Sequence, residues 1–341
     1  MHAFAADPAR GLFILILLAV FVGGALILYA WRAPTLADGG RFTPLSRETG
    51  ILLNNIFFTV AAFSVLLGTL YPLILDAFGF GKISVGPPYF NAVFVPLAVF
   101  PAALAVVGAL SRWKNDTFLR VSVKLSPPLV AAIICGALSP LWADGEYQIS
   151  AAFGLFLAYW VFFGTLCAAF SHIMAKKSFV GGGFWGMLIA HAGIAFFVVG
   201  VTCVGVYEKE KDVRLVIGEG RDFGGYVWTL EEIRDEKGQN YNAVAGILLV
   251  EKDGNIITRL KPEKRAYFAR PENAMSEAGI HPGWHGDLYA SLGEKLLDGA
   301  WSARLQVKPF IRFIWGGALL MAIGGLVAVI GRRRQRKGGR A

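Results

Sequence analysis

The sequence predicts an α-helical polytopic membrane protein of about seven transmembrane helices, with one small external β domain. Of its 341 residues, 55% are hydrophobic, and the mean hydropathy is +0.53, which is too apolar for an ordinary soluble protein. Several apolar runs are long enough to cross a hydrocarbon core of roughly 30 Å. One stretch near the C-terminal end instead alternates apolar with other residues, as a half-buried strand does.

We expect the spans at residues 11–31, 51–74, 89–110, 127–142, 149–174, 184–206 and 310–331. The fourth run is the weakest, since it is short and contains Pro127, Pro128 and Pro140. It is predicted to be broken or tilted, or to be a re-entrant or buried element. The predicted organisation is a bundle of six spans at 1–206, an external β domain at 207–309, and a final helix with a basic cytoplasmic tail at 310–341.

The distribution of basic residues in the short loops predicts the orientation. One set of loops holds fifteen: Arg32, Arg41, Arg47, Arg112, Lys114, Arg120, Lys124, Lys176, Lys177, Arg332, Arg333, Arg334, Arg336, Lys337 and Arg340. The opposite set holds only Arg10 and Lys82. By the positive-inside rule, the first set and the C-terminus are cytoplasmic, whereas the N-terminus and residues 207–309 lie outside.

Composition also excludes several classes of function. The net charge of +9 does not indicate nucleic-acid binding, because the charges gather at the ends of apolar runs. The basic tail is better explained as an anchor on anionic lipid. The three cysteines lie inside apolar runs and form no CxxC pair, so we interpret them as packing residues. No phosphate-binding loop, catalytic triad or nucleophile elbow supports a hydrolase or an ATPase.

The external segment is predicted to form a compact barrel or sandwich. Its alternating sets are Val213, Leu215 and Ile217; Tyr226, Trp228 and Leu230; and Trp301, Ala303, Leu305 and Val307. Asp253 and Gly254 lie between two β-prone runs and predict a tight hairpin turn.

His191 is the first candidate for chemistry, because it lies in the middle of an apolar run. An ionisable group at membrane depth is costly and is functional by default, and neutral imidazole is a common haem ligand. Its neighbours Gly186, Ala190 and Gly193 are small, so that another helix or a flat ligand can approach closely. The alternative is an interhelical hydrogen bond without a cofactor. Haem held by two histidines would need a second one at a similar depth. The only other histidine within a span is His172, which lies at that span's cytoplasmic end, so the second axial ligand would be expected from another chain.

The remaining histidines are weaker candidates on residue type alone. His2 lies on the external side, near the membrane surface, and a terminal histidine is ordinarily inert. His281 and His285 have the i, i+4 spacing of a helical metal site. However, Pro282 and Gly283 intervene, and they predict a solvent-facing loop instead.

Two polar segments near the second and third spans have open interpretations. Asn54 and Asn55 can cap or bridge helices, or can donate a hydrogen bond to a ligand carboxylate. The external loop at 81–91 contains Lys82, Tyr89 and Phe90. It can contact a haem propionate or a partner protein, or it can serve as an ordinary interfacial anchor.

Several stretches together resemble one family, the large membrane subunit of bacterial cytochrome c haem lyase (the CcmF/NrfE family). They are HAFAADPARGLFI at 2–14, LLNNIFFTVAAFSVLLGTLYPL at 52–73, GKISVGPPYFNAVFVPL at 81–97, AHAGIAFFVVGVT at 190–202, LKPEKRAY at 260–267, DLYASLGE at 287–294 and VKPFIRFIWGGALLMAIGG at 307–325. The resemblance covers essentially the whole chain but only the C-terminal half of the family. The family's Trp-rich external segment is absent here, so the N-terminal half is expected as a separate chain or a missing segment.

The resemblance implies residue roles. His2 matches the second of two histidines that hold an external substrate haem in the family. His191 matches the later of two histidines that hold a transmembrane haem b. In each case the partner histidine belongs to the half that is missing here. This chain alone is therefore expected to be insufficient for activity and to hold no stoichiometric haem.

The resemblance also implies the reaction and the partners. A haem lyase complex of the cytochrome c maturation system attaches haem covalently to a Cys-x-x-Cys-His motif of apocytochrome c through thioethers. The transmembrane haem b relays electrons that reduce the substrate haem. The implied partners are the N-terminal half, a haem chaperone, apocytochrome c and other maturation subunits, with quinol as a further candidate and no nucleic acid.

Two alternatives from other functional classes remain open. The chain can be a non-catalytic membrane scaffold or haem-handling subunit that docks partners through its β domain, inactive without its N-terminal half. It can also be a transport subunit, although no inverted repeat is visible in the sequence. Haem content distinguishes the lyase from the scaffold, and solute flux would identify a transporter.

Overall fold

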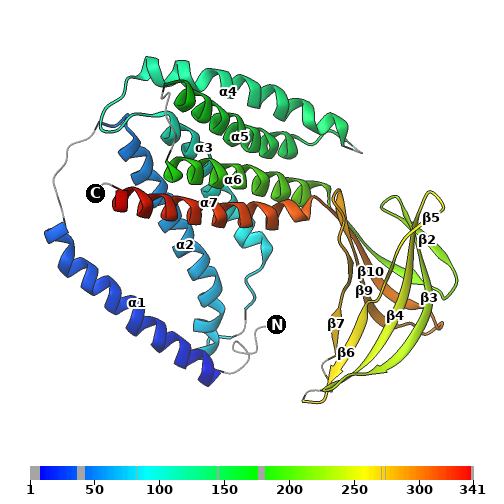
Figure 1. Ribbon diagram of the computed structural model, residues 1–341. Coiled ribbons are helices and arrows are strands. Elements are labelled where there is room, and N and C mark those ends of the chain that lie inside the picture. The colour runs from blue at the N-terminus through cyan, green and yellow to red at the C-terminus, as the bar shows by residue number, and fades with distance from the viewer. Residues whose placement is uncertain are drawn as a thin grey trace. The chain divides into compact units, whose positions relative to one another are not determined.

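The computed structural model describes residues 8–36, 43–81, 83–143, 146–175, 181–269, 271–272 and 274–338. Within these ranges seven helices are long and apolar enough to cross a membrane, which confirms the predicted number. Ten strands lie between the last two of these helices (Figure 1). The chain divides into two compact units, one formed by residues 1–132 with 160–177 and the other by 133–159 with 178–341.

The first unit contains α1 (Pro8–Leu36), α2 (Arg47–Ala77) and α3 (Pro87–Leu110). Helices α2 and α3 pack together, and the rings of Phe57 and Phe100 stack between them with their centroids 4.5 Å apart. The Arg47 side chain donates hydrogen bonds of 2.8 Å to the carbonyl oxygens of Gly108 and Ala109. These bonds satisfy carbonyl oxygens in the last turn of α3, because the last carbonyls of a helix have no hydrogen-bond donor within the helix itself.

The predicted fourth span is longer than expected and is not broken. Helix α4 runs from Phe118 to Leu138 and continues as a 3₁₀ turn, Ser139–Trp142. Pro127 and Pro128 lie inside the helix, and Pro140 lies in the 3₁₀ turn. The predicted start at residue 127 was wrong because Arg120 and Lys124 interrupt the apolar pattern of the first turns, where Arg120 forms an ion pair with Asp116. Helix α5 follows at Ile149–Ala175.

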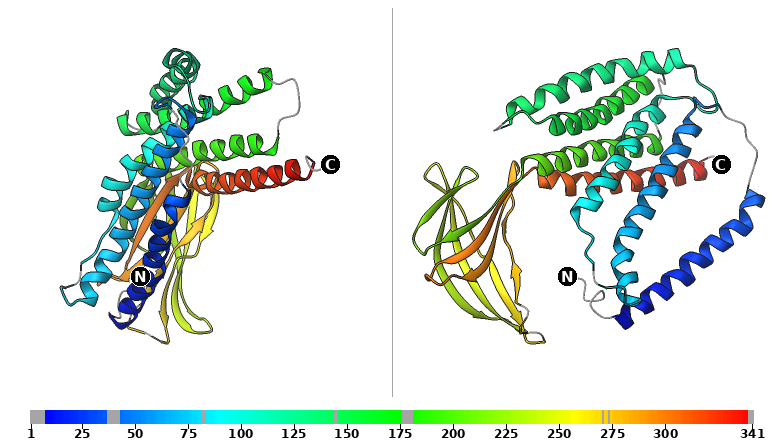
Figure 2. Two further views of the ribbon diagram at one scale, coloured as in Figure 1. Left: turned by 90° about the vertical axis from the view of Figure 1, so that its left-hand side faces the viewer. Right: turned by 180° about the vertical axis from the view of Figure 1, so that it is seen from behind.

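A seam of glycines joins α6 (Gly182–Tyr207) to α7 (Ile311–Gly338) in the second unit. The two helices lie side by side along their lengths (Figure 1, Figure 2). A Cβ placed on Gly193 would lie 2.7 Å from the Gly317 carbonyl oxygen, and one on Gly200 would lie 2.7 Å from the Ile314 nitrogen. Only the absence of side chains allows the two backbones to approach so closely.

The strands form a two-layer sandwich, which is one of the two predicted architectures, a barrel or a sandwich. One sheet has the order β1 (Lys209–Leu215), β10 (Trp301–Pro309), β9 (Gly286–Lys295), β8 (Gly279–His281). The other has the order β2 (Gly220–Phe223), β3 (Tyr226–Lys237), β4 (Tyr241–Lys252), β6 (Glu263–Tyr267), β7 (Met275–Glu277), with β5 (Asn255–Leu260) also paired to β4. All named strand pairs are antiparallel.

The inward-facing residues of both sheets form one hydrophobic core. Its buried members are Leu215, Trp228, Leu230, Leu248, Val250, Leu260, Leu288, Ala290, Ala303 and Leu305. The Trp228 indole donates a 3.0 Å hydrogen bond to the Phe223 carbonyl oxygen, so that its polar atom has a partner while the ring is fully buried. Most of the predicted alternating residues therefore face the core.

Two local predictions for the sandwich have different outcomes. Asp253 and Gly254 have φ of 51° and 76° and connect β4 to β5, which confirms the predicted hairpin. Ile217 does not continue the alternation, because β1 ends at Leu215. It forms only an isolated bridge with Leu230 and is 55% exposed.

The glycine seam predicts a matched pair of substitutions in α6. In Gly186→Ala the new Cβ would lie 2.6 Å from the Ala328 nitrogen, whereas Gly183 has open space around it. We expect Gly186→Ala to lower stability by about 1–3 kcal/mol, as overpacking does. Gly183→Ala should be neutral or stabilising by up to roughly 1 kcal/mol, because alanine favours helix more than glycine does. Thermal unfolding in detergent measures both, and equal midpoints would contradict the seam.

A buried carboxylate in the sandwich predicts a pH-dependent effect. Glu263 accepts a 2.8 Å hydrogen bond from Arg265, which holds the pKa of Glu263 below its usual value although burial opposes this. The resulting stability is present above the unfolded carboxyl pKa and is lost as the pH falls through the lowered folded value. Glu263→Gln should therefore be destabilising at neutral pH, and this difference should disappear in acid. Denaturant melts across pH measure it, with Glu272→Gln as the control for loss of an exposed carboxylate in the same domain.

Candidate functional site

His191 lies on the face of α6 that points away from α7. The helix begins at Gly182, so the ring lies about 13 Å along the axis, at about 1.5 Å per residue. Gly186, Ala190 and Gly193, which were predicted to admit a helix or a flat ligand, contact α7. Because His191 is two residues from Gly193, the two side chains project to nearly opposite sides. The small residues of α6 therefore hold a helix, and the imidazole is on the other side.

The Nδ1 atom of His191 is buried and has no hydrogen-bond partner among the described residues. A neutral imidazole carries one donor and one acceptor nitrogen, and a buried polar atom without a partner costs about 1–3 kcal/mol. The alternative expected from sequence, an interhelical hydrogen bond, is not made through this atom.

The other described histidines lie on separate elements. His172 lies in the last turn of α5. His281 ends β8 and His285 lies in the following loop, which confirms that this pair is not on a helix. Over the described part of the chain, no group of three or more His, Cys, Asp or Glu residues is arranged to hold a metal ion. His2 lies outside the described residues.

Asn54 and Asn55 do not cap the second helix, which was one of their predicted roles. Helix α2 begins at Arg47, and Ser46 is its N-cap, with the hydroxyl accepting a 3.2 Å hydrogen bond from the Thr49 nitrogen. The two asparagines lie about two turns further along. The charge of Arg47 hid this helix start from the hydropathy pattern.

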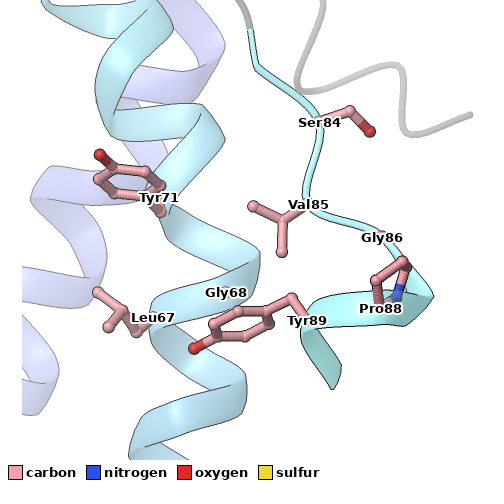
Figure 3. Close-up of a pocket in the computed structure, with 8 residues that line it drawn as sticks. All are labelled: Leu67, Gly68, Tyr71, Ser84, Val85, Gly86, Pro88 and Tyr89. Atoms are coloured by element: carbon pink, nitrogen blue, oxygen red, sulfur yellow. The ribbon is translucent and has the colours of Figure 1, made fainter. Parts of the chain in front are cut away.

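The loop before α3 forms one wall of an apolar cavity of about 630 Å³ (Figure 3). The lining residues are Leu67, Gly68, Tyr71, Ser84, Val85, Gly86, Pro88 and Tyr89. Tyr89 packs on Gly68, and its hydroxyl donates a 2.9 Å hydrogen bond to the Ser64 carbonyl oxygen. The volume is within the range of small-molecule sites. Lys82, the cation predicted to serve this loop, lies outside the described residues.

Sequence reasoning missed this cavity and a polar atom at the end of α6. The hydroxyl oxygen of Tyr207 is buried without a partner among the described residues. A tyrosine that ends an apolar run is usually an interfacial anchor, so the sequence carries no signal for its burial. The cavity was missed because α2 and the loop meet only in the folded chain.

Comparison with known proteins identifies the family of this chain. Residues 206–309 match the family described as CcmF C-terminal beta-sandwich, which covers the strands of the second unit. The cytochrome c-type biogenesis protein CcmF of Pseudomonas aeruginosa is 42% identical over 98% of this chain and 51% of that protein. The chain belongs to the CcmF and NrfE family of cytochrome c-type biogenesis proteins. Among other members, CcmF of Escherichia coli is 37% identical over 99% of this chain and 52% of that protein. NrfE of Haemophilus influenzae is 33% identical over 99% of this chain and 53% of that protein.

A solved structure of the family has the same fold. Cytochrome c haem lyase CcmF aligns with a TM-score of 0.68 and 26% identity, over 84% of this chain and 46% of that chain. The chain thus spans about half the length of the CcmF and NrfE proteins it matches. Its helices and β sandwich correspond to that part of the family.

The unpartnered Nδ1 atom of His191 predicts a gain of stability when the ring is removed. In protein prepared without haem, His191→Leu should raise the unfolding midpoint, because the buried polar atom is replaced by apolar atoms of similar volume. His285→Leu, at an exposed loop position, should give no such gain. Thermal melts of the two variants and the parent measure this. A lower midpoint for His191→Leu would show that the ring has a structural partner.

Proposed function

We propose that this chain is the C-terminal part of a cytochrome c haem lyase, and that His191 is an axial ligand of a transmembrane haem b. The observation that carries the proposal is the buried, unpartnered Nδ1 of His191 in the middle of an apolar helix. The names of its relatives, cytochrome c-type biogenesis proteins, agree with it.

The protein's own contribution is to hold and orient the ligand. When bound, haem b supplies one-electron chemistry, by which electrons pass to the substrate haem. His191 offers the nitrogen lone pair of an imidazole at membrane depth, within an apolar helix. The glycine seam fixes α6 against α7, so that the ring's direction is set by the backbone. The second axial histidine would come from the N-terminal half of the family.

His2 is proposed as the ligand of the substrate haem on the external face. Apocytochrome c would bring a histidine that displaces one axial ligand, and the two cysteine thiols of its Cys-x-x-Cys-His motif would add across the haem vinyl groups. Each addition forms one carbon–sulfur bond and moves the thiol proton to carbon, with no net oxidation. A haem chaperone would deliver the substrate, other maturation subunits would assemble with the complex, and quinol is the proposed electron source.

The proposed location is the bacterial inner membrane, with residues 207–309 in the periplasm and the basic tail in the cytoplasm. The excess of basic residues in one set of loops supports this orientation. The β sandwich would then lie on the side where apocytochrome c is matured.

A reduced-minus-oxidised spectrum tests the proposed ligand. The chain is co-expressed with an N-terminal half of the family and purified with and without His191→Ala. We expect the b-type signal to be lost in the variant, because the iron loses an axial nitrogen, and to be kept in His172→Ala. An unchanged spectrum for His191→Ala would move the scaffold interpretation ahead of the lyase. Solute flux that depends on the chain would favour transport.

A further inference from the structure

An exposed tryptophan lies in the short loop between β8 and β9, beside the start of the last helix. The Trp284 side chain is 77% exposed, although tryptophan is the largest apolar side chain. The next residue, His285, accepts a 3.2 Å hydrogen bond at its carbonyl oxygen from the Phe310 nitrogen. Phe310 directly precedes α7, so the loop is attached where that helix begins.

A buried carboxylate fixes the loop in this position. Asp287, only 6% exposed, accepts a 2.9 Å hydrogen bond from the Gly283 nitrogen. The same carboxylate oxygen lies 3.4 Å from Nε of Arg312 in the first turn of α7. The loop, β9 and the start of α7 are thus connected through one side chain. The Asp287 side chain is largely shielded from water, whereas that of Arg312 is 38% exposed, so the carboxylate and its bond to the loop backbone are the firmer part of this connection.

This attachment sets the level of Trp284 relative to the bilayer. The membrane span of α7 begins at Ile311, and the exposed Trp315 lies one turn further along it. Tryptophan is enriched at the membrane–water boundary, where its ring meets acyl chains and its N–H meets headgroups. A loop that is hydrogen-bonded to the residue before the span lies at this boundary.

We propose that Trp284 and its loop form a lipid-interface anchor that holds the β sandwich against the bilayer. The occupant is the boundary between phospholipid headgroups and acyl chains, because the loop is continuous with a membrane span. The two cations closest in sequence to Phe310 are already paired, Lys308 with Glu208 at 3.0 Å and Arg312 with Asp287. The contact is therefore attributed to the apolar loop and its attachment to α7 rather than to charge, and it should change little with salt or with the fraction of anionic lipid.

The other end of strand β9 provides a matched control. Leu297 lies in the turn between β9 and β10 and is fully exposed. Strand β9 has 10 residues, so this turn lies about 33 Å from the anchor loop, at about 3.3 Å per residue. Both positions are apolar, exposed and in the same domain, and they differ in their distance from the start of α7.

Lipid quenching of a fluorophore tests the anchor in the full chain. Trp284→Cys and Leu297→Cys are made in a background with Cys135, Cys167 and Cys203 replaced by Ala, and each is labelled with a small fluorophore. The proteins are reconstituted in phosphatidylcholine vesicles containing nitroxide-labelled lipid. We expect quenching at position 284 to be several-fold greater than at 297, and to be unchanged by added salt or phosphatidylglycerol.

Two results would overturn the anchor. One is equal, weak lipid quenching at both positions. The other is protection of position 284 from an aqueous quencher only after another maturation subunit is added, which would make the loop a protein-docking surface. Hydroxyl-radical footprinting of the unmodified chain in nanodiscs provides a measurement without substitutions. It should show less oxidation of Trp284 in nanodiscs than after the lipid is exchanged for a short-chain detergent, and equal oxidation would count against the anchor.

Discussion

The close approach of α6 and α7 determines much of the second unit. Without side chains at positions such as Gly193 and Gly317, the two backbones come so near that even a methyl group would collide. Lipid gives no hydrophobic drive for helix association, so this packing must come from van der Waals contact over the whole seam. It also decides which face of α6 is covered. The face opposite the seam carries His191, and the imidazole therefore does not point at α7.

The same pair of helices carries the β sandwich. Helix α6 leads directly into β1, and β10 leads into α7, while β1 and β10 pair with each other from Lys209 with Val307 to Leu215 with Trp301. The helix seam and the strand ladder thus form one continuous antiparallel arrangement. Trp228 and the core around it then close the second sheet over the first. A shift of one helix along the other would have to break this ladder as well as the seam.

Sequence alone predicted the number of spans, the β domain and its hairpin, because these depend on local hydropathy and alternation. It misplaced the starts of two helices for one physical reason. Arg47 and Arg120 are charged, yet each finds a partner in the fold, the carbonyls at the end of α3 for one and Asp116 for the other. His191 was found because a lone ionisable residue in an apolar run is rare. The direction in which its side chain points was not predicted, because Gly186 and Gly193 are equally suited to a ligand or a helix. The sequence does not show that α7 packs there.

The central claim is that α7 covers one face of α6 and leaves His191 on the other as a haem ligand. The most direct test replaces the ligand rather than deleting it. In the co-expressed complex, His191→Met should keep the haem, show a His/Met ligand signature in near-infrared magnetic circular dichroism, and raise the reduction potential, as methionine ligation does. An unchanged bis-histidine signature at an unchanged potential would contradict the claim and would make His191 a structural residue.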